Sequence, residues 1–82
     1  MEDKENMIEL SPTELELCFA AISVESLSRK LDKPYYVVFE ALSRTGAIKD
    51  YLIKYYDVLH TQSREYVDDS LIEYLTVRNA MP

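Results

Sequence analysis

Apolar residues along the chain recur every three or four positions, which is the spacing of one face of an α-helix. The period stops around Asp32-Lys33-Pro34, at Gly46 and across His60–Glu65. The pattern therefore predicts an all-α fold, a compact bundle of four helices with a long first helix. We expect a flexible N-terminal tail over residues 1–10, one helical domain over residues 11–79 and a frayed end beyond it.

Capping signals place the helix ends. Ser11 and Glu14 have the spacing of a capping box, which predicts that the first helix begins at Ser11 and runs to about Leu31. Asp32 is predicted to cap the second helix, and Gly46 to end it in the left-handed conformation. The carboxylates of Asp68-Asp69 favour a helix start, so the fourth helix is predicted to begin there.

Each of the three later helices has one face that is predicted to point inward. On the second helix this face carries Tyr35, Val38, Phe39 and Leu42; on the third, Ile48, Leu52, Tyr55 and Leu59; and on the fourth, Leu71, Tyr74 and Leu75. These faces predict a single core between the helices.

The first helix has more apolar surface than one face requires. A first row contains Leu15, Cys18, Phe19 and Ile22, and a second row contains Leu17, Ala20, Val24, Leu27 and Leu31. The two rows lie on roughly opposite sides of the helix, so it must be covered nearly all round. We expect the second row to face another protein, either a different chain or a second copy. The alternative is a central core helix with no interface role.

Composition narrows the function classes. The chain has 82 residues and a formal net charge of −6, and negative charge disfavours binding to phosphate backbones. Its single cysteine allows no internal disulfide and, with one histidine, no common structural zinc site. No apolar stretch is long enough to span a membrane, and the polar start MEDKEN is unlike a signal peptide. We expect a cytoplasmic protein without a metal or cofactor.

The aromatic residues and His60 are the remaining candidates for chemistry. Tyr51 and Tyr56 combine apolar area with a polar tip, which suits either a core edge or an interface. His60 can cap the end of the third helix, contact a partner or, beside Tyr56 and Asp57, act as an acid or base. Capping is the interpretation favoured by its position, and we expect no enzymatic activity.

The second and third helices, joined at Gly46, are also similar to a helix-turn-helix. The helix that would enter DNA carries Asp50 and Asp57 as well as Lys49 and Lys54. A DNA-binding transcriptional regulator is therefore the alternative function, although the mixed charge disfavours it.

The run Tyr56-Asp57-Val58-Leu59-His60-Thr61, preceded by Gly46-Ala47-Ile48 and followed by Glu65-Tyr66-Val67, resembles the signature of a small bacterial family of unknown function. The resemblance extends over roughly residues 15–76. It implies a compact helical domain, often encoded beside ADP-ribosyltransferase-like proteins in an apparent toxin–antitoxin arrangement. It implies no activity and no catalytic residue.

The leading hypothesis is a non-catalytic protein-binding module, acting as the antitoxin or accessory partner of an ADP-ribosyltransferase-like toxin. Its partner is a protein or a second copy of the chain, rather than nucleic acid or a membrane. The residues predicted to bind the partner are Leu17, Val24, Leu27, Leu31, Tyr51, Tyr56, His60 and Gln62.

Overall fold

The computed structural model describes residues 12–82, and every regular element in that range is helical. The elements are α2 (Glu14–Leu31), α3 (Tyr35–Arg44), the π-helix η1 (Ile48–Ile53), α4 (Tyr56–Leu59) and α5 (Arg64–Val77). The predicted all-α class and long first helix are confirmed for this part of the chain. The predicted tail over residues 1–10 and the predicted cap Ser11 lie outside the described residues.

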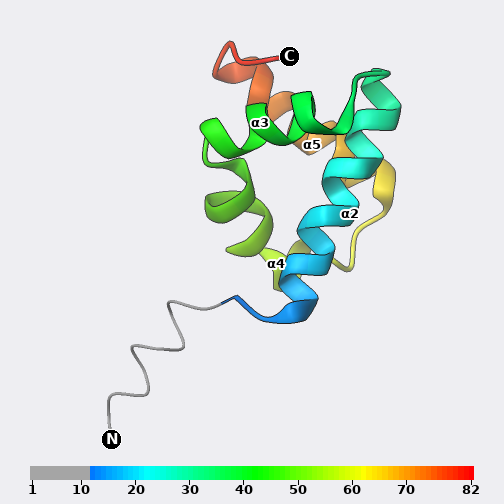
Figure 1. The fold of residues 1–82 in the computed structure, drawn as a ribbon. Helices are drawn as coiled ribbons and strands as arrows, with labels where there is room; N and C mark the ends of the chain where they lie inside the picture. The colour runs from blue at the N-terminus through cyan, green and yellow to red at the C-terminus, as the bar shows by residue number, and fades with distance from the viewer. Residues whose placement is uncertain (1–11) are drawn as a thin grey trace, which may run out of the picture.

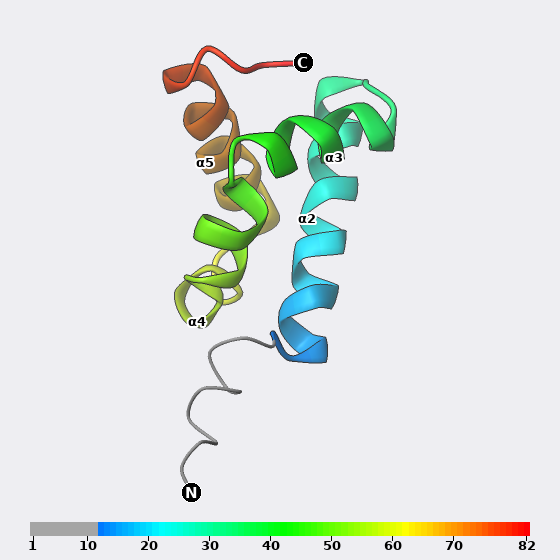
Figure 2. The same ribbon diagram turned by 60° about the vertical axis from the view of Figure 1, so that its left-hand side comes forward.

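The other helices pack against one side of α2. Figures 1 and 2 show α3 crossing near the C-terminal end of α2, η1 and α4 descending toward its N-terminal end, and α5 returning toward α3. α2 packs against α3, η1 and α5. This arrangement makes α2 the central helix of the described region.

A capping box starts α2, two residues later than predicted. The Glu16 backbone N–H donates to Thr13 Oγ1 over 3.1 Å, and the Thr13 N–H donates to Glu16 Oε1 over 2.9 Å. Thr13, in an extended conformation, is therefore the N-cap. The prediction of a start at Ser11 is wrong because two overlapping boxes fit this acidic stretch, and the helix uses the one formed by Thr13 and Glu16.

Asp32 ends α2 instead of starting α3. It adopts the left-handed conformation with φ of 57°, and its N–H donates to the Arg29 carbonyl over 3.2 Å. The next N–H, that of Lys33, donates to the Ser28 carbonyl over 3.0 Å. These bonds satisfy carbonyls left free at the C-terminus of the helix. The N-cap of α3 is Pro34, which makes no side-chain capping bond.

The turn at Gly46 is as predicted. Gly46 has φ of +83°, a conformation that costs other residues about 1–2 kcal/mol. A Cβ atom there would also lie 2.9 Å from Asp50 Oδ2. The Tyr74 hydroxyl donates to the Thr45 carbonyl over 2.9 Å, so α5 holds this turn in place.

The predicted third helix is not one regular α-helix. Residues Ile48–Ile53 form a π-helix, and Tyr55, with φ of −107° and ψ of 26°, separates it from the single turn of α4. Leu52 and Leu59 are buried as predicted, whereas Tyr55 is 47% exposed instead of inward-facing. The wider turn of a π-helix changes the direction of the side chains that follow it, and the apolar spacing gives no sign of this change.

α5 begins well before the predicted start. The Tyr66 N–H donates to Ser63 Oγ over 3.0 Å, which makes Ser63 the N-cap. Asp68 is buried and accepts a hydrogen bond from Ser26, so its carboxylate serves a tertiary contact instead of a cap. The predicted fraying at the other end is also wrong. Asn79 is left-handed with φ of 56°, and the Ala80 N–H donates to the Leu75 carbonyl over 2.8 Å.

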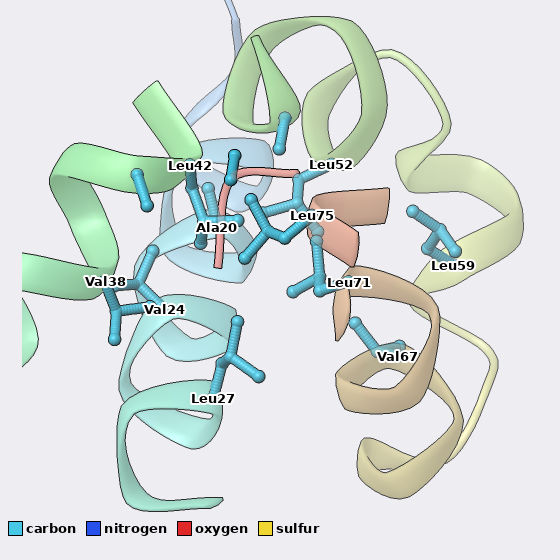
Figure 3. Packing of buried hydrophobic residues seen from close by; sticks show 13 residues of the cluster. Ala20, Val24, Leu27, Val38, Leu42, Leu52, Leu59, Val67, Leu71 and Leu75 are labelled. Atoms are coloured by element: carbon cyan, nitrogen blue, oxygen red, sulfur yellow. The ribbon is translucent and has the colours of Figure 1, made fainter. Parts of the chain in front are cut away.

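The core lies between α2, α3, η1 and α5. Its largest fully buried side chains are Leu27, Leu42, Leu52, Leu71, Leu75, Val24, Val38 and Val67, most of which are seen meeting in Figure 3. Each such burial contributes about 1.5–3 kcal/mol relative to exposure. These contacts fix the orientation of α2 and therefore decide which of its sides remains outside.

Candidate protein-binding surface

One side of α2 belongs to the core. Val24 is 1% exposed and Leu27 is 0% exposed, and with Ala20 they form the inner row of this helix. Most of the second row defined above is thus sealed by the chain itself. The prediction that Val24 and Leu27 face a partner is wrong, because side chains from α3, η1 and α5 already cover them.

The two ends of the second row differ from its middle. Leu17, near the start of α2, is 51% exposed, and Leu31, at its end, is half-buried against the core. Leu17 therefore remains available to a partner, whereas Leu31 contributes mainly to the fold.

The opposite side of α2 is apolar and exposed. Leu15 is 67% exposed, Ile22 is 53% exposed, and Cys18 between them is also exposed. These three residues form the outer row. Their spacing of three and four places them along one line of the helix, and no other described element covers it.

Phe19 joins the outer row to an aromatic stack. It follows Leu15 by four residues and precedes Ile22 by three, so it neighbours both on the helix surface. Its ring meets Tyr56 edge to face, with 5.5 Å between the ring centroids. Tyr56 in turn stacks on His60, with centroids 4.4 Å apart and planes inclined by 10°. The outer row therefore continues as the aromatic stack of Phe19, Tyr56 and His60.

Arg64, the first residue of α5, also contacts the Phe19 ring. Its guanidinium carbon lies 5.4 Å from the Phe19 ring centroid, a cation–π distance. Its Nη2 donates to Ser23 Oγ over 3.2 Å, which satisfies a fully buried hydroxyl. The Nη1 atom is buried without a hydrogen-bond partner. Arg64 was not among the predicted site residues.

Two further polar contacts extend this junction between α2 and α5. Ser26 Oγ donates to Asp68 Oδ2 over 2.8 Å, and Lys30 Nζ lies 3.4 Å from Asp69 Oδ1. Residue numbers rise together on both helices, so α2 and α5 run in the same general direction. We call the contacts of Ser23, Ser26 and Lys30 with α5 the polar seam, and it separates the inner row from the outer surface.

Tyr51 belongs to a different aromatic group from Tyr56 and His60. Its ring lies 6.0 Å from Tyr55 and 5.6 Å from Tyr74. The Arg78 guanidinium covers Tyr74 at 3.5 Å from the ring centroid. The predicted site residues Tyr51 and Tyr56 are therefore not brought together. Gln62 is exposed in the loop before α5, where its N–H donates to the Leu59 carbonyl over 3.0 Å.

His60 lies at the end of α4, and capping of the helix carbonyls by its imidazole stays a prediction. It is the C-cap of α4, and its N–H donates to the Tyr56 carbonyl over 3.0 Å. Within residues 12–82, no ion pair or hydrogen bond joins His60 to Asp57. Over the same range, no group of three histidine, cysteine, aspartate or glutamate side chains is placed to hold a metal.

A second exposed aromatic group lies on α3. Tyr35 and Phe39, which were predicted to face inward, are each 45% exposed and stack on one another at 6.2 Å. Tyr36 beside them is 66% exposed. The core instead takes Val38, Ala41 and Leu42 from this helix, because α3 crosses the end of α2 and presents only one narrow side to it.

A signal for the exposed side of α2 is present in the sequence. Continued at the same spacing, the outer row meets Glu25 and then Arg29, which pair with each other over 2.6 Å. The second row stays apolar to Leu31. An apolar row that runs the whole length of a helix favours the core, and one that gives way to charges after two turns favours a surface.

The fold and this surface define a small all-α domain with one apolar, aromatic-edged side. A family model described as "Protein of unknown function (DUF3791)" matches residues 18–78, and the chain belongs to that family. No curated protein and no solved structure matches the chain at a significant level. No helix in residues 12–82 is both long and apolar enough to cross a membrane.

Proposed function

We propose that this chain is a non-catalytic module that binds another protein through the outer row of α2 and the adjoining aromatic stack. The observation that supports this proposal is the exposure of Leu15, Cys18 and Ile22 on a helix whose inner row is buried in the core. Grouped apolar side chains on a surface are characteristic of interaction sites.

The aromatic stack adds the kind of residues that anchor interfaces. Tyr56 is half-buried and already held between Phe19 and His60, so little side-chain freedom is lost when a partner covers it. Covering the exposed halves of Leu15 and Ile22 would add about 1 kcal/mol each, at ~25 cal/mol per Å² of apolar surface. The surface therefore suits a partner that buries several side chains together.

The biological role we propose is that of antitoxin or accessory partner to an ADP-ribosyltransferase-like toxin. The resemblance around Tyr56–Thr61 supports this role, because it implies a gene beside that of an ADP-ribosyltransferase-like protein. In this role the chain covers or distorts the toxin's site in a stoichiometric complex and needs no chemistry of its own.

Co-expression tests the proposal. The full chain is produced together with the product of the neighbouring gene, which the resemblance implies is an ADP-ribosyltransferase-like protein, and the mixture is separated by size-exclusion chromatography. We expect the two proteins to co-elute, and the toxin's activity to fall to background at one equivalent of this chain. Separate elution of two active, folded proteins would eliminate the antitoxin role.

The two alternative functions predict different experimental results. A DNA-binding regulator using α3 and η1 would shift its own promoter fragment in a salt-dependent manner. An enzyme centred on Tyr56, Asp57 and His60 would lose its function on His60→Gln substitution with its fold intact. We expect neither result.

A further inference from the structure

The outer row lies in an acidic part of the molecule. From Glu14 to Ser28, α2 carries Glu14, Glu16 and Glu25 but no lysine or arginine; its first cation is Arg29. Glu14 and Glu25 are exposed on the flank of the outer row away from α5.

The other flank is acidic as well. Asp69 of α5 reaches Lys30 of α2 across the polar seam, at 3.4 Å. Glu65 lies one turn before Asp69 on the same side of α5 and is exposed. Arg64 is half-buried, lies 5.4 Å from the Phe19 ring centroid and donates to Ser23. Glu25 is paired with Arg29 and Asp69 with Lys30. The negative charge that flanks the outer row therefore comes mainly from Glu14 on one side and Glu65 on the other.

This charge arrangement selects among possible occupants. Two copies joined through their outer rows would bring the Glu14 and Glu16 carboxylates of both chains together, while Arg29 is already paired with Glu25. Like charges at an interface are destabilising. Nucleic acid and anionic lipid are repelled for the same reason. A positively charged segment of a protein would instead be attracted to this acidic surface.

The length and straightness of the outer row indicate that the partner segment is a helix. Leu15, Cys18 and Ile22 cover two turns of a straight helix, about 10 Å at 1.5 Å per residue. A second helix that presents apolar residues at positions i, i+3, i+4 and i+7 matches this length. Phe19 lies beside the row and can contact residues along one edge of such a helix.

We propose that the partner of this surface is an amphipathic helix whose apolar face is flanked by lysine or arginine, and that it packs lengthwise on the outer row between Glu14 and Glu25 on one side and Glu65 on the other. The inference rests on the proposed protein-binding function and specifies the chemistry of the partner. The aromatic stack forms one end of the binding site.

A designed peptide tests this without the natural partner. The probe is a helical peptide of about 14 residues with leucine at i, i+3, i+4 and i+7 and lysine at the remaining exposed positions. The control peptide carries glutamate at every lysine position. Each is titrated into the full, isotope-labelled chain to about 1 mM, and backbone amide shifts are followed by two-dimensional NMR.

We expect the lysine peptide to shift amides over residues 15–22 and 56–60, and to bind at least about tenfold more tightly than the glutamate peptide. Raising the salt concentration should weaken this binding. The double substitution Leu15→Ser with Ile22→Ser should abolish it, and Glu14→Gln with Glu65→Gln should weaken it several-fold. Tyr36→Ser, which removes an equally exposed apolar side chain on α3, should leave it unchanged.

Several results would overturn the inference: no shift at the highest concentration, equal binding of both peptides, shifts centred on α3, or insensitivity to the Leu15 and Ile22 substitutions. Dimerisation that Ile22→Ser abolishes would assign the row to a second copy instead. Failure of the proposed function is recognised separately, as the absence of a complex with the natural partner. A stable complex that survives Leu15→Ser with Ile22→Ser retains the function and eliminates this site.

Discussion

In the sequence, the inner and outer rows of α2 are similarly apolar, but in the fold the inner row is buried and the outer row is exposed. Val24 and Leu27 are sealed by three neighbouring elements, while Leu15 and Ile22 remain more than half exposed on the same helix. Both rows are apolar over the first half of the helix. Local hydrophobicity therefore indicates that a side of a helix needs covering, but it does not show which neighbour covers it.

The polar seam is the physical boundary between the two rows. Ser23 and Ser26, which lie between the rows, bond to Arg64 and Asp68 of α5. These bonds hold α5 against one flank of α2 and prevent it from covering the outer row. If α5 moved over the outer row, these two hydroxyls would lose their partners, and buried hydroxyls without partners are costly.

The largest expected effect separates the two rows directly. Leu27→Ala should lower the free energy of unfolding by about 2–5 kcal/mol, because it leaves a cavity in the core. Ile22→Ala should change it by no more than about 0.5 kcal/mol. Urea denaturation of both variants, followed by circular dichroism, measures the difference. Equal losses would mean that the outer row is also core.

The next effect tests the seam. Arg64→Ala should cost about 1–3 kcal/mol, since it removes the contact with Phe19 and leaves the buried Ser23 hydroxyl without its partner. Lys30→Ala is the matched control, because its pair with Asp69 is largely exposed and should contribute at most about 1 kcal/mol. Thermal unfolding of the two variants provides the comparison. A larger loss of stability for Lys30→Ala would show that the Lys30–Asp69 pair, and not Arg64, contributes most to the polar seam.

A smaller effect is expected at the turn that brings η1 against the inner row. Gly46→Ala should cost about 1–2 kcal/mol because the residue is left-handed. Gly46→Asn should cost less, since asparagine tolerates this conformation and meets the same neighbouring Asp50 side chain. Chemical denaturation of the pair measures this order. The reverse order would indicate that the space beside Asp50, and not the backbone conformation, limits this position.

The smallest effect concerns the start of α2, where the outer row begins. Thr13→Ala should cost about 1 kcal/mol through loss of the capping box, and Thr13→Ser should retain most of the stability. Hydrogen exchange of the amides in the first turn should rise in the alanine variant only. Unchanged exchange there would place the effective cap elsewhere.

Much of the fold could be predicted because its signals are local. The left-handed turn at Gly46 and the inward positions of Val38, Leu42, Leu71 and Leu75 follow from residue type and spacing. The starts of α2 and α5 were missed because several residues in each stretch can cap, and only the surrounding contacts choose among them. The break at Tyr55 was missed because a π-helix changes side-chain direction without changing the apolar pattern.

The candidate surface was predicted less well than the fold. Leu17, Tyr56, His60 and Gln62 lie at or near the surface, but Val24 and Leu27 are core, and Tyr51 lies in a separate group. Arg64 was missed because its partner Ser23 lies about forty positions away along the chain. The exposure of the outer row was missed although the row gives way to Glu25 and Arg29, which is a local signal.

By itself, the sequence determined an all-α chain, an unusually apolar central helix, an acidic charge and most of the core, since these depend on residue type and helical spacing. Only the tertiary structure decided which side of α2 was buried. That choice depends on where α5 packs, and α5 is positioned by Arg64 and Asp68 meeting serines on a helix far away in sequence.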